Sequence, residues 1–154
     1  MLSRQASHAL KALLLLASEP QAWQSTHQLA REQELPEPFL EQLLLRLRRA
    51  GLLTARRGRL GGYRLARPAR EIAVAAVLAG LGEPVGHGAP EPQPNRPDAA
   101  HSHRSASDQV TAALERRLER ARQKALEALS LEDLLFDLRS AEASRDEQGG
   151  LLLG

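Results

Sequence analysis

Apolar residues recur at helical spacing near the N-terminus and define one face of a first helix. Ser3 can cap that helix, and Pro20 ends the pattern. Ser25 followed by Gln28 resembles a capping box and predicts a short second helix with buried positions at 29–30. The apolar face of the first helix consists of Ala6, Ala9, Leu10, Leu13, Leu14 and Ala17.

A third helix is predicted from the two prolines at 36 and 38 to about Ala50, because proline suits a first helical turn. Leucines at a spacing of 0, 3, 4 and 7 line one face of this helix, namely Leu40, Leu43, Leu44 and Leu47. The opposite face then carries Pro38, Glu41, Gln42, Leu45, Arg46 and Arg49. Two helices joined by a short turn, the second polar and basic on its outer face, predict a helix-turn-helix.

A basic hairpin follows the third helix. Residues 52–55 and 63–65 are strand candidates, and three glycines between them permit a tight turn. Pro68 ends the hairpin, and small apolar residues predict a fourth helix at 74–81. Residues 1–81 are therefore expected to form a winged helix-turn-helix DNA-binding domain.

The second half of the chain has a different pattern. Residues 82–107 are rich in proline without apolar periodicity, which predicts a flexible loop. Residues 108–138 are expected to form a dimerisation helix and a short final helix capped by Ser130, and residues 139–154 a disordered tail. The fold class is thus mainly α, with a winged helix-turn-helix domain and a long C-terminal dimerisation helix. The seam expected to pair with a second copy in a homodimer consists of Val110, Leu114, Leu118, Ala121, Ala125 and Ala128.

Charge divides unevenly along the chain. Residues 1–70 carry 12 Lys and Arg against 5 Asp and Glu, whereas residues 71–154 carry 9 against 14. Nine arginines and no acidic residue lie between Gln42 and Arg70. Because this run lacks acidic residues for pairing, it favours a surface that binds nucleic acid over an ordinary solvated face.

Composition excludes several classes of function. Cysteine is absent, which excludes disulfides, thiol catalysis and thiolate metal sites. Aromatic residues make up 3%, which argues against stacking platforms for single-stranded nucleic acid. No apolar run reaches membrane-spanning length and no cleavable signal is recognised, so a cytoplasmic protein is expected. No nucleophile motif, phosphate loop or paired-carboxylate site is found, so the chain is not expected to be an enzyme.

With these elements placed, the sequence resembles the Rrf2 family of bacterial transcription regulators. The matching segments include PFLEQLLLRLRRAGLL, RRGRLGGYRLARP and LSLEDLL. The resemblance implies a homodimeric winged helix-turn-helix that binds an imperfect palindrome in double-stranded DNA. It assigns base reading to Glu41 and Gln42 and a minor-groove contact to Arg57. These roles suit the side chains, since Gln pairs with adenine, Glu accepts from cytosine, and a narrow minor groove attracts Arg.

Further residues are expected to face DNA. Arg46 and Arg49 are expected to meet phosphates, and Arg56 and Arg59 add cations at the hairpin tip. The remaining candidates are His8, Thr26, Pro38 and Phe39. Family members often have a hydroxyl residue and Tyr in place of the last two, so one or two contacts are expected to be lost.

The family also includes iron–sulfur and nitric-oxide sensors, and its cluster-binding members place three cysteines in the loop after the fourth helix. This chain has none, so no cysteine-ligated cluster and no cofactor are expected. His87, His101 and His103 are weak candidates for a metal, and solvated loop histidines are the favoured interpretation. The alternative function is a winged-helix interaction module that has lost specific DNA binding and whose basic wing meets an acidic protein. An effector or partner protein is left open.

Overall fold

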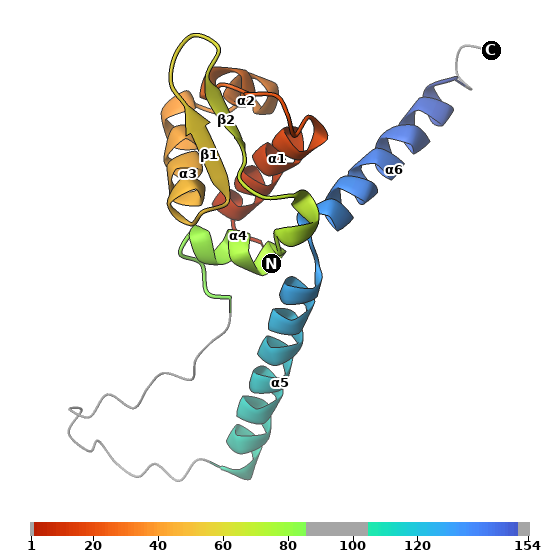
Figure 1. Cartoon of the computed structure of the whole chain (residues 1–154). Coiled ribbons are helices and arrows are strands. Elements are labelled where there is room, and N and C mark those ends of the chain that lie inside the picture. The colour runs from red at the N-terminus through yellow and green to blue at the C-terminus, as the bar shows by residue number, and fades with distance from the viewer. Residues whose placement is uncertain (1, 86–104, 151–154) are drawn as a thin grey trace.

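The computed structural model of the chain describes residues 2–85 and 105–150, and this part is mainly helical (Figure 1). A winged helix-turn-helix is followed by two long helices, so the predicted fold class is confirmed. The elements are, in chain order, α1 (Arg4–Ser18), α2 (Thr26–Gln33), α3 (Glu37–Arg49), β1 (Leu53–Arg56), β2 (Gly62–Leu65), the short 3-10 helix η1 (Ala69–Glu71), α4 (Val74–Gly80), α5 (Ala106–Ala128) and α6 (Leu131–Gly150).

The first two helices begin at the capping residues that the sequence predicts. The Ser3 hydroxyl oxygen accepts a hydrogen bond from the Ala6 N–H at 3.1 Å, and α2 begins with the capping box of Ser25 and Gln28. These caps satisfy backbone N–H groups that have no partner within the helix. The helices are thereby fixed at their N-terminal ends, and the C-terminal end of α2 leads into the turn before α3.

The core lies between α1, α2, α3, α4 and the hairpin, and leucines dominate it. All four leucines on the predicted inner face of α3 are buried, and the inner face of α1 is buried except for Leu14, which is half-buried. Leu131 and Leu135 of α6 complete the core from the C-terminal half of the chain. Burial of the leucine face of α3 directs the opposite face of this helix outward.

The hairpin is anchored to the loop between α1 and α2. β1 and β2 pair in antiparallel register from Leu53 opposite Leu65 to Arg56 opposite Gly62. The Gln24 N–H donates to the Tyr63 carbonyl at 3.0 Å, and the Tyr63 N–H donates to the Gln24 carbonyl at 2.8 Å. Gly62 is required here, because its φ is +141° and a Cβ would lie 2.4 Å from the Gln24 carbonyl oxygen.

The two long helices join the winged domain at the segment between them. The Val74 N–H donates to the Leu129 carbonyl and the Leu131 N–H donates to the Ile72 carbonyl, both at 2.8 Å. Ser130 caps α6 as predicted, and its N–H and hydroxyl donate to the Asp133 carboxylate, which lowers the pKa of that group. Figure 1 shows α5 and α6 extending from this junction in different directions.

The length of the final helix differs from the prediction. The sequence pattern ends the helix at Leu138 and leaves a disordered tail, whereas α6 continues to Gly150. The prediction followed apolar periodicity, which stops at Leu138, but residues 139–148 contain no proline or glycine and include several good helix formers. All side chains described beyond Leu138 are exposed, so backbone hydrogen bonds and helix propensity form this part without packing. Residues 151–154 lie outside the described chain.

Candidate nucleic-acid interface

The outward face of α3 is polar and basic. Gln42, Arg46 and Arg49 are exposed, as is Pro38 in the first turn. One guanidinium nitrogen of Arg46 donates to the Gln5 side-chain oxygen at 3.2 Å, a single bond that leaves most of its donors free. The face therefore offers an amide that can pair with a base edge and two cations that can meet phosphates.

Glu41 belongs to the same helix but is held by neighbours on two other elements. The Thr26 hydroxyl at the start of α2 donates to one carboxylate oxygen, and the Tyr63 hydroxyl on β2 donates to the other at 2.9 Å. Glu41 is half-buried. This carboxylate therefore links α2, α3 and the hairpin, and the structure brings together two candidate residues, Thr26 and Glu41, with a tyrosine that the sequence analysis did not single out.

The Tyr63 hydroxyl is held in its protonated form. Burial of the ring, then the hydrogen bond to Glu41 and the charge of that carboxylate, raise the pKa of Tyr63 to about 12, while Arg48 acts in the opposite direction. Tyr63 is consequently a reliable donor to Glu41 at neutral pH. The bond fixes the base of the hairpin relative to α3.

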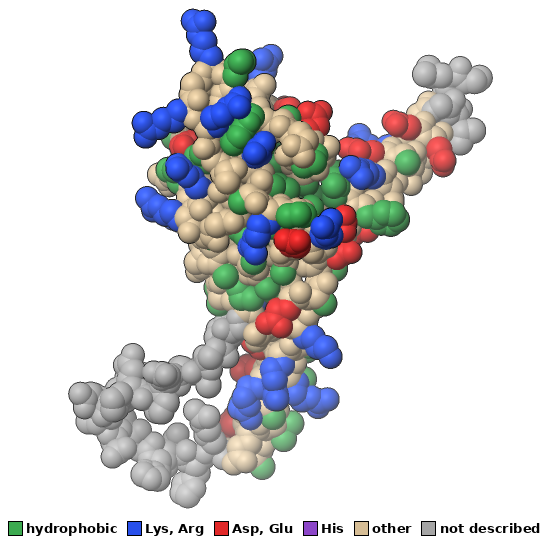
Figure 2. All heavy atoms as spheres, viewed as in Figure 1, with side chains coloured by type: hydrophobic (Ala, Val, Ile, Leu, Met, Phe, Trp, Pro, Cys, Tyr) green, Lys and Arg blue, Asp and Glu red, His purple; other side chains and the backbone are tan. Residues whose placement is uncertain are grey.

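The hairpin tip concentrates positive charge. Arg56, Arg57 and Arg59 are all exposed, and within the described residues none of them forms an ion pair. Figure 2 shows Lys and Arg side chains gathered along the hairpin and the α3 side of the winged domain. Like charges without acidic partners repel one another, and a polyanion would relieve that repulsion.

The Trp23 ring contacts two of the arginines on the hairpin, Arg56 and Arg64. The Arg64 guanidinium carbon lies 4.3 Å from the centroid of the Trp23 ring, and that of Arg56 lies 4.8 Å from it. Arg56 also donates to the Leu60 carbonyl at 2.6 Å. Cation–π contacts of this kind stabilise by about 0.5–1 kcal/mol at exposed sites. Neither Trp23 nor Arg64 is predicted as a site residue from the sequence, although a lone tryptophan in a chain with an arginine-rich hairpin was the available signal.

Two other candidates lie against each other between α1 and α3. The His8 and Phe39 rings pack edge to face with centroids 6.0 Å apart, and both residues are half-buried. The Nδ1 atom of His8 is buried, and no described residue forms a hydrogen bond with it. These contacts give both side chains a packing role near the N-terminal end of α3.

The face of α5 assigned to dimerisation is open in the single chain. Val110, Leu114 and Leu118 are 68, 52 and 62% exposed, which is unusual for three large apolar residues in succession along one helix face. Ala121 and Ala125 continue this face and are also exposed. Several residues on the opposite side of α5, including Leu126, are half-buried toward the rest of the chain.

The remaining candidates concern metals and membranes. His87, His101 and His103 lie outside the described residues. Within the two described ranges, no group of three His, Cys, Asp or Glu side chains could hold a metal ion. Nor is any helix in those ranges both long and apolar enough to cross a bilayer.

Comparison with known proteins identifies the family. Residues 2–137 match the model of the Rrf2 family, described as an iron-dependent transcriptional regulator. A protein of Synechocystis sp. (strain ATCC 27184 / PCC 6803 / Kazusa), named as an HTH-type transcriptional regulator, is 38% identical over 147 residues, which are 95% of each chain. The HTH-type transcriptional regulator IscR of Cereibacter sphaeroides is 40% identical over 87 residues, covering 54% of this chain and 56% of that protein.

Solved structures agree with this assignment. T. potens IscR superimposes with a TM-score of 0.69 at 29% identity and covers 92% of this chain and 90% of its own. Staphylococcus aureus CymR superimposes with a TM-score of 0.62 at 28% identity and covers 86% of this chain and 96% of its own.

The iron in the family description can be tested against the donor atoms of this chain. Cluster iron is held by cysteine thiolates, and the sequence contains no cysteine, so the residues present do not fit a cysteine-ligated cluster. The family assignment does not depend on that ligand set, because it rests on the match over residues 2–137 and on the winged fold. The chain belongs to the Rrf2 family of transcriptional regulators.

Proposed function

We propose that this protein is a dimeric, sequence-specific DNA-binding regulator that acts on an imperfect palindrome and carries no cysteine-ligated iron–sulfur cluster. The observation that carries the proposal is the exposed Gln42, Arg46 and Arg49 face of α3 beside a hairpin tip whose arginines have no ion pair in the described chain. Such a regulator acts in the cytoplasm, where bacterial chromosomal DNA lies.

The proposed docking places α3 in the major groove. Gln42 pairs with an adenine edge, while Arg46 and Arg49 neutralise phosphates beside it. The hairpin then reaches the adjacent minor groove, where Arg57 enters and Arg56 and Arg59 meet the backbone. Base reading comes from α3, and most of the salt-dependent affinity comes from the arginines.

Glu41 has a double role in this proposal. Each of its oxygens accepts one hydrogen bond, from Thr26 or from Tyr63. A carboxylate oxygen has two lone pairs, so accepting from a cytosine amino group is compatible with both bonds. The two internal bonds hold the carboxylate in one orientation, which sharpens its preference for a base at one position.

The open face of α5 supports the proposed dimer. An apolar row with three side chains more than half exposed is covered when two α5 helices pair about a two-fold axis. The pairing sets the spacing of the two α3 helices, and hence the spacing of the two half-sites. We propose Val110, Leu114, Leu118, Ala121 and Ala125 as the contact residues of this seam.

Selection from random double-stranded DNA with the purified protein tests the function. We expect a motif with two-fold symmetry and an affinity that falls steeply with salt. Recovery of sequences without a common motif, together with tight binding to an acidic protein, would instead favour the interaction module.

Gln42→Ala separates base reading from general attraction. We expect a loss of about 1–3 kcal/mol on the selected site and little change on random DNA, because the amide contacts bases only. Arg46→Ala or Arg49→Ala should weaken binding to the selected site and to random DNA alike. Either change should reduce the slope of log affinity against log salt concentration by about 0.9. Gln148→Ala, an exposed glutamine on α6, is the control, and fluorescence anisotropy measures all four variants. An equal loss on both DNAs for Gln42→Ala would remove this residue from base reading.

A further inference from the structure

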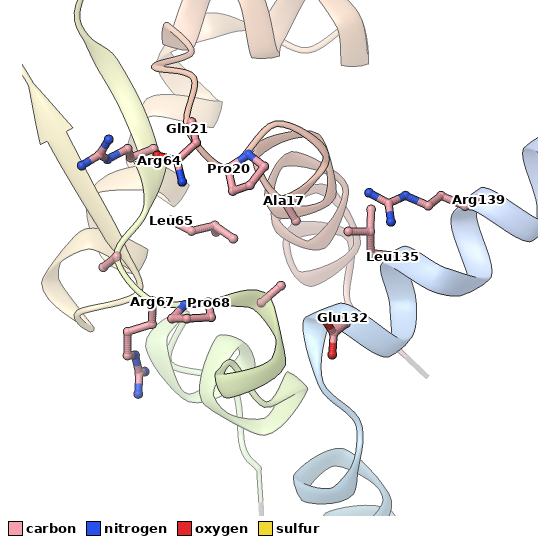
Figure 3. Close-up of a pocket in the computed structure, with 12 residues that line it drawn as sticks. Ala17, Pro20, Gln21, Arg64, Leu65, Arg67, Pro68, Glu132, Leu135 and Arg139 are labelled. Atoms are coloured by element: carbon pink, nitrogen blue, oxygen red, sulfur yellow. The ribbon is translucent and has the colours of Figure 1, made fainter.

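A cavity of about 510 Å³ lies between the winged domain and α6 (Figure 3). Its walls come from the C-terminal end of α1, from β2 and the segment that leads to η1, and from the first turns of α6. Small-molecule sites in proteins occupy about 300–1,000 Å³ and often lie between structural units. None of the DNA-facing or dimer-forming residues proposed above lines this cavity.

The lining combines an apolar surface with three arginines, Arg64, Arg67 and Arg139, and Figure 3 shows that only Arg139 is directed across that surface. Pro20, Leu65 and Leu135 supply apolar walls. Figure 3 shows the Arg139 side chain reaching from α6 over this surface, and within the described residues Arg139 has no hydrogen bond or ion pair. Glu132 is the one acidic lining residue, and Figure 3 shows its carboxylate directed away from Arg139. A guanidinium beside apolar walls suits an anion with a hydrocarbon body.

We propose that this cavity binds a small organic carboxylate. The carboxylate pairs with the Arg139 guanidinium, and the hydrocarbon part covers Leu65, Leu135 and Pro20. The ligand would thus contact both the winged domain and α6. All residues proposed to contact the ligand lie within the described residues.

A chain of side-chain contacts connects the cavity with the hairpin tip. Arg64 lines the cavity, and its guanidinium lies over the Trp23 ring. Arg56 lies against the same ring and donates to the Leu60 carbonyl at the tip. A ligand that restricts the Arg64 side chain therefore favours one arrangement of Trp23 and Arg56. This regulatory consequence, unlike the site itself, rests on the proposed function.

Binding is tested without DNA on the full-length protein. Hexanoate and 3-phenylpropionate are titrated into it, with hexanamide and 3-phenylpropionamide as neutral controls, and amide shifts in ¹H–¹⁵N spectra locate the site. We expect both carboxylates to shift Gln21, Leu65 and Leu135 and to change the emission of Trp23, the one tryptophan in the chain. An absence of shifts at these residues, or equal binding of the amides, would overturn the proposal.

Arg139→Gln tests the cation, with Arg145→Gln on the exposed part of α6 as the matched control. Loss of a charge-assisted pair should weaken carboxylate binding by on the order of tenfold in the first variant and leave the second unchanged. Equal affinities of wild type and Arg139→Gln would refute the assigned role of Arg139.

The effect of the ligand on DNA binding is measured on the DNA site selected from random sequences. We expect 3-phenylpropionate to change DNA affinity severalfold in the wild type and not in Arg139→Gln. A carboxylate that binds without altering DNA affinity would refute the regulation while the site stands. A protein that binds the carboxylate and no DNA would refute the proposed function alone.

Discussion

Tyr63 connects three parts of the winged domain through its backbone and its hydroxyl. Its main chain pairs with Gln24 in the loop before α2, and its hydroxyl donates to Glu41 on α3. The position of the hairpin relative to α3 therefore depends on this residue. This link therefore sets the position of α3, proposed for the major groove, relative to the hairpin, proposed for the minor groove.

Tyr63 is the one tyrosine in the chain, so the absorbance of tyrosinate reports its ionisation directly. We expect a pKa of about 12 in the wild type. Glu41→Gln should lower this pKa by removing a nearby negative charge, yet keep it above the ordinary value of about 10, because burial is the largest cause of the shift. Glu37→Gln changes an acid on the same helix that pairs with His27, and it should have no effect. A pKa near 10 in the wild type would contradict the bond to Glu41.

The same shift predicts how stability depends on alkaline pH. The pKa of Tyr63 is higher in the folded protein than in the unfolded chain, so its contribution is complete below about pH 10 and is lost as the pH rises toward 12. Urea midpoints measured over this range should fall more steeply for the wild type than for Tyr63→Phe. Identical slopes for the two proteins would show that the hydroxyl contributes nothing.

At the scale of elements, the sequence predicts what depends on local spacing. The leucine face of α3, the caps at Ser3 and Ser25 and the hairpin all follow from patterns within a few residues, and the structure confirms them. The bonds of Glu41 to Thr26 and Tyr63 join residues 15 and 22 positions apart. No local pattern encodes such pairs, because the chain path must be known first.

The extent of α6 and the cation–π contacts of Trp23 were missed for related reasons. Apolar periodicity locates helices that pack, whereas the second half of α6 packs against nothing described. Trp23 meets Arg56 and Arg64 only after β2 pairs with Gln24. The DNA-facing and dimer-forming residues could be proposed from the sequence, but their roles stay predictions until binding is measured.

The hairpin is the element whose charge we expect to divide into two roles. Arg56 contacts Trp23 and donates to the Leu60 carbonyl, which holds its guanidinium in one place for a phosphate, whereas no such contact of Arg57 or Arg59 is found in the described residues. Arg57→Ala should weaken binding to the selected site more than Arg59→Ala, because Arg57 is the proposed minor-groove contact. Anisotropy titrations on the selected and on a random duplex compare the two. Equal losses would mean that the tip supplies only diffuse charge.

For the whole molecule, the critical surface is the open row of apolar residues on α5. We predict that the wild type sediments as a dimer at micromolar concentration and that Leu118→Glu sediments as a monomer, because a buried carboxylate without a partner is costly. Arg116→Glu changes the charge on the opposite side of α5 and should remain a dimer. The monomeric variant should also bind a half-site and the full palindrome with similar affinity. A wild type that sediments as a monomer would contradict the proposed dimer.

Because the chain contains no cysteine, we expect its DNA binding not to respond to oxygen. A cysteine-ligated cluster would give visible absorption and would make the protein respond to redox changes. This chain has no thiol to hold such a cluster, so protein purified with or without air should be colourless and should bind the selected DNA with equal affinity. Iron analysis, visible spectra and paired anisotropy titrations check this directly. Iron that co-purifies with a visible band, or an affinity that changes severalfold with oxygen, would mean that other side chains hold the metal, and His87→Ala, His101→Ala and His103→Ala would then identify them.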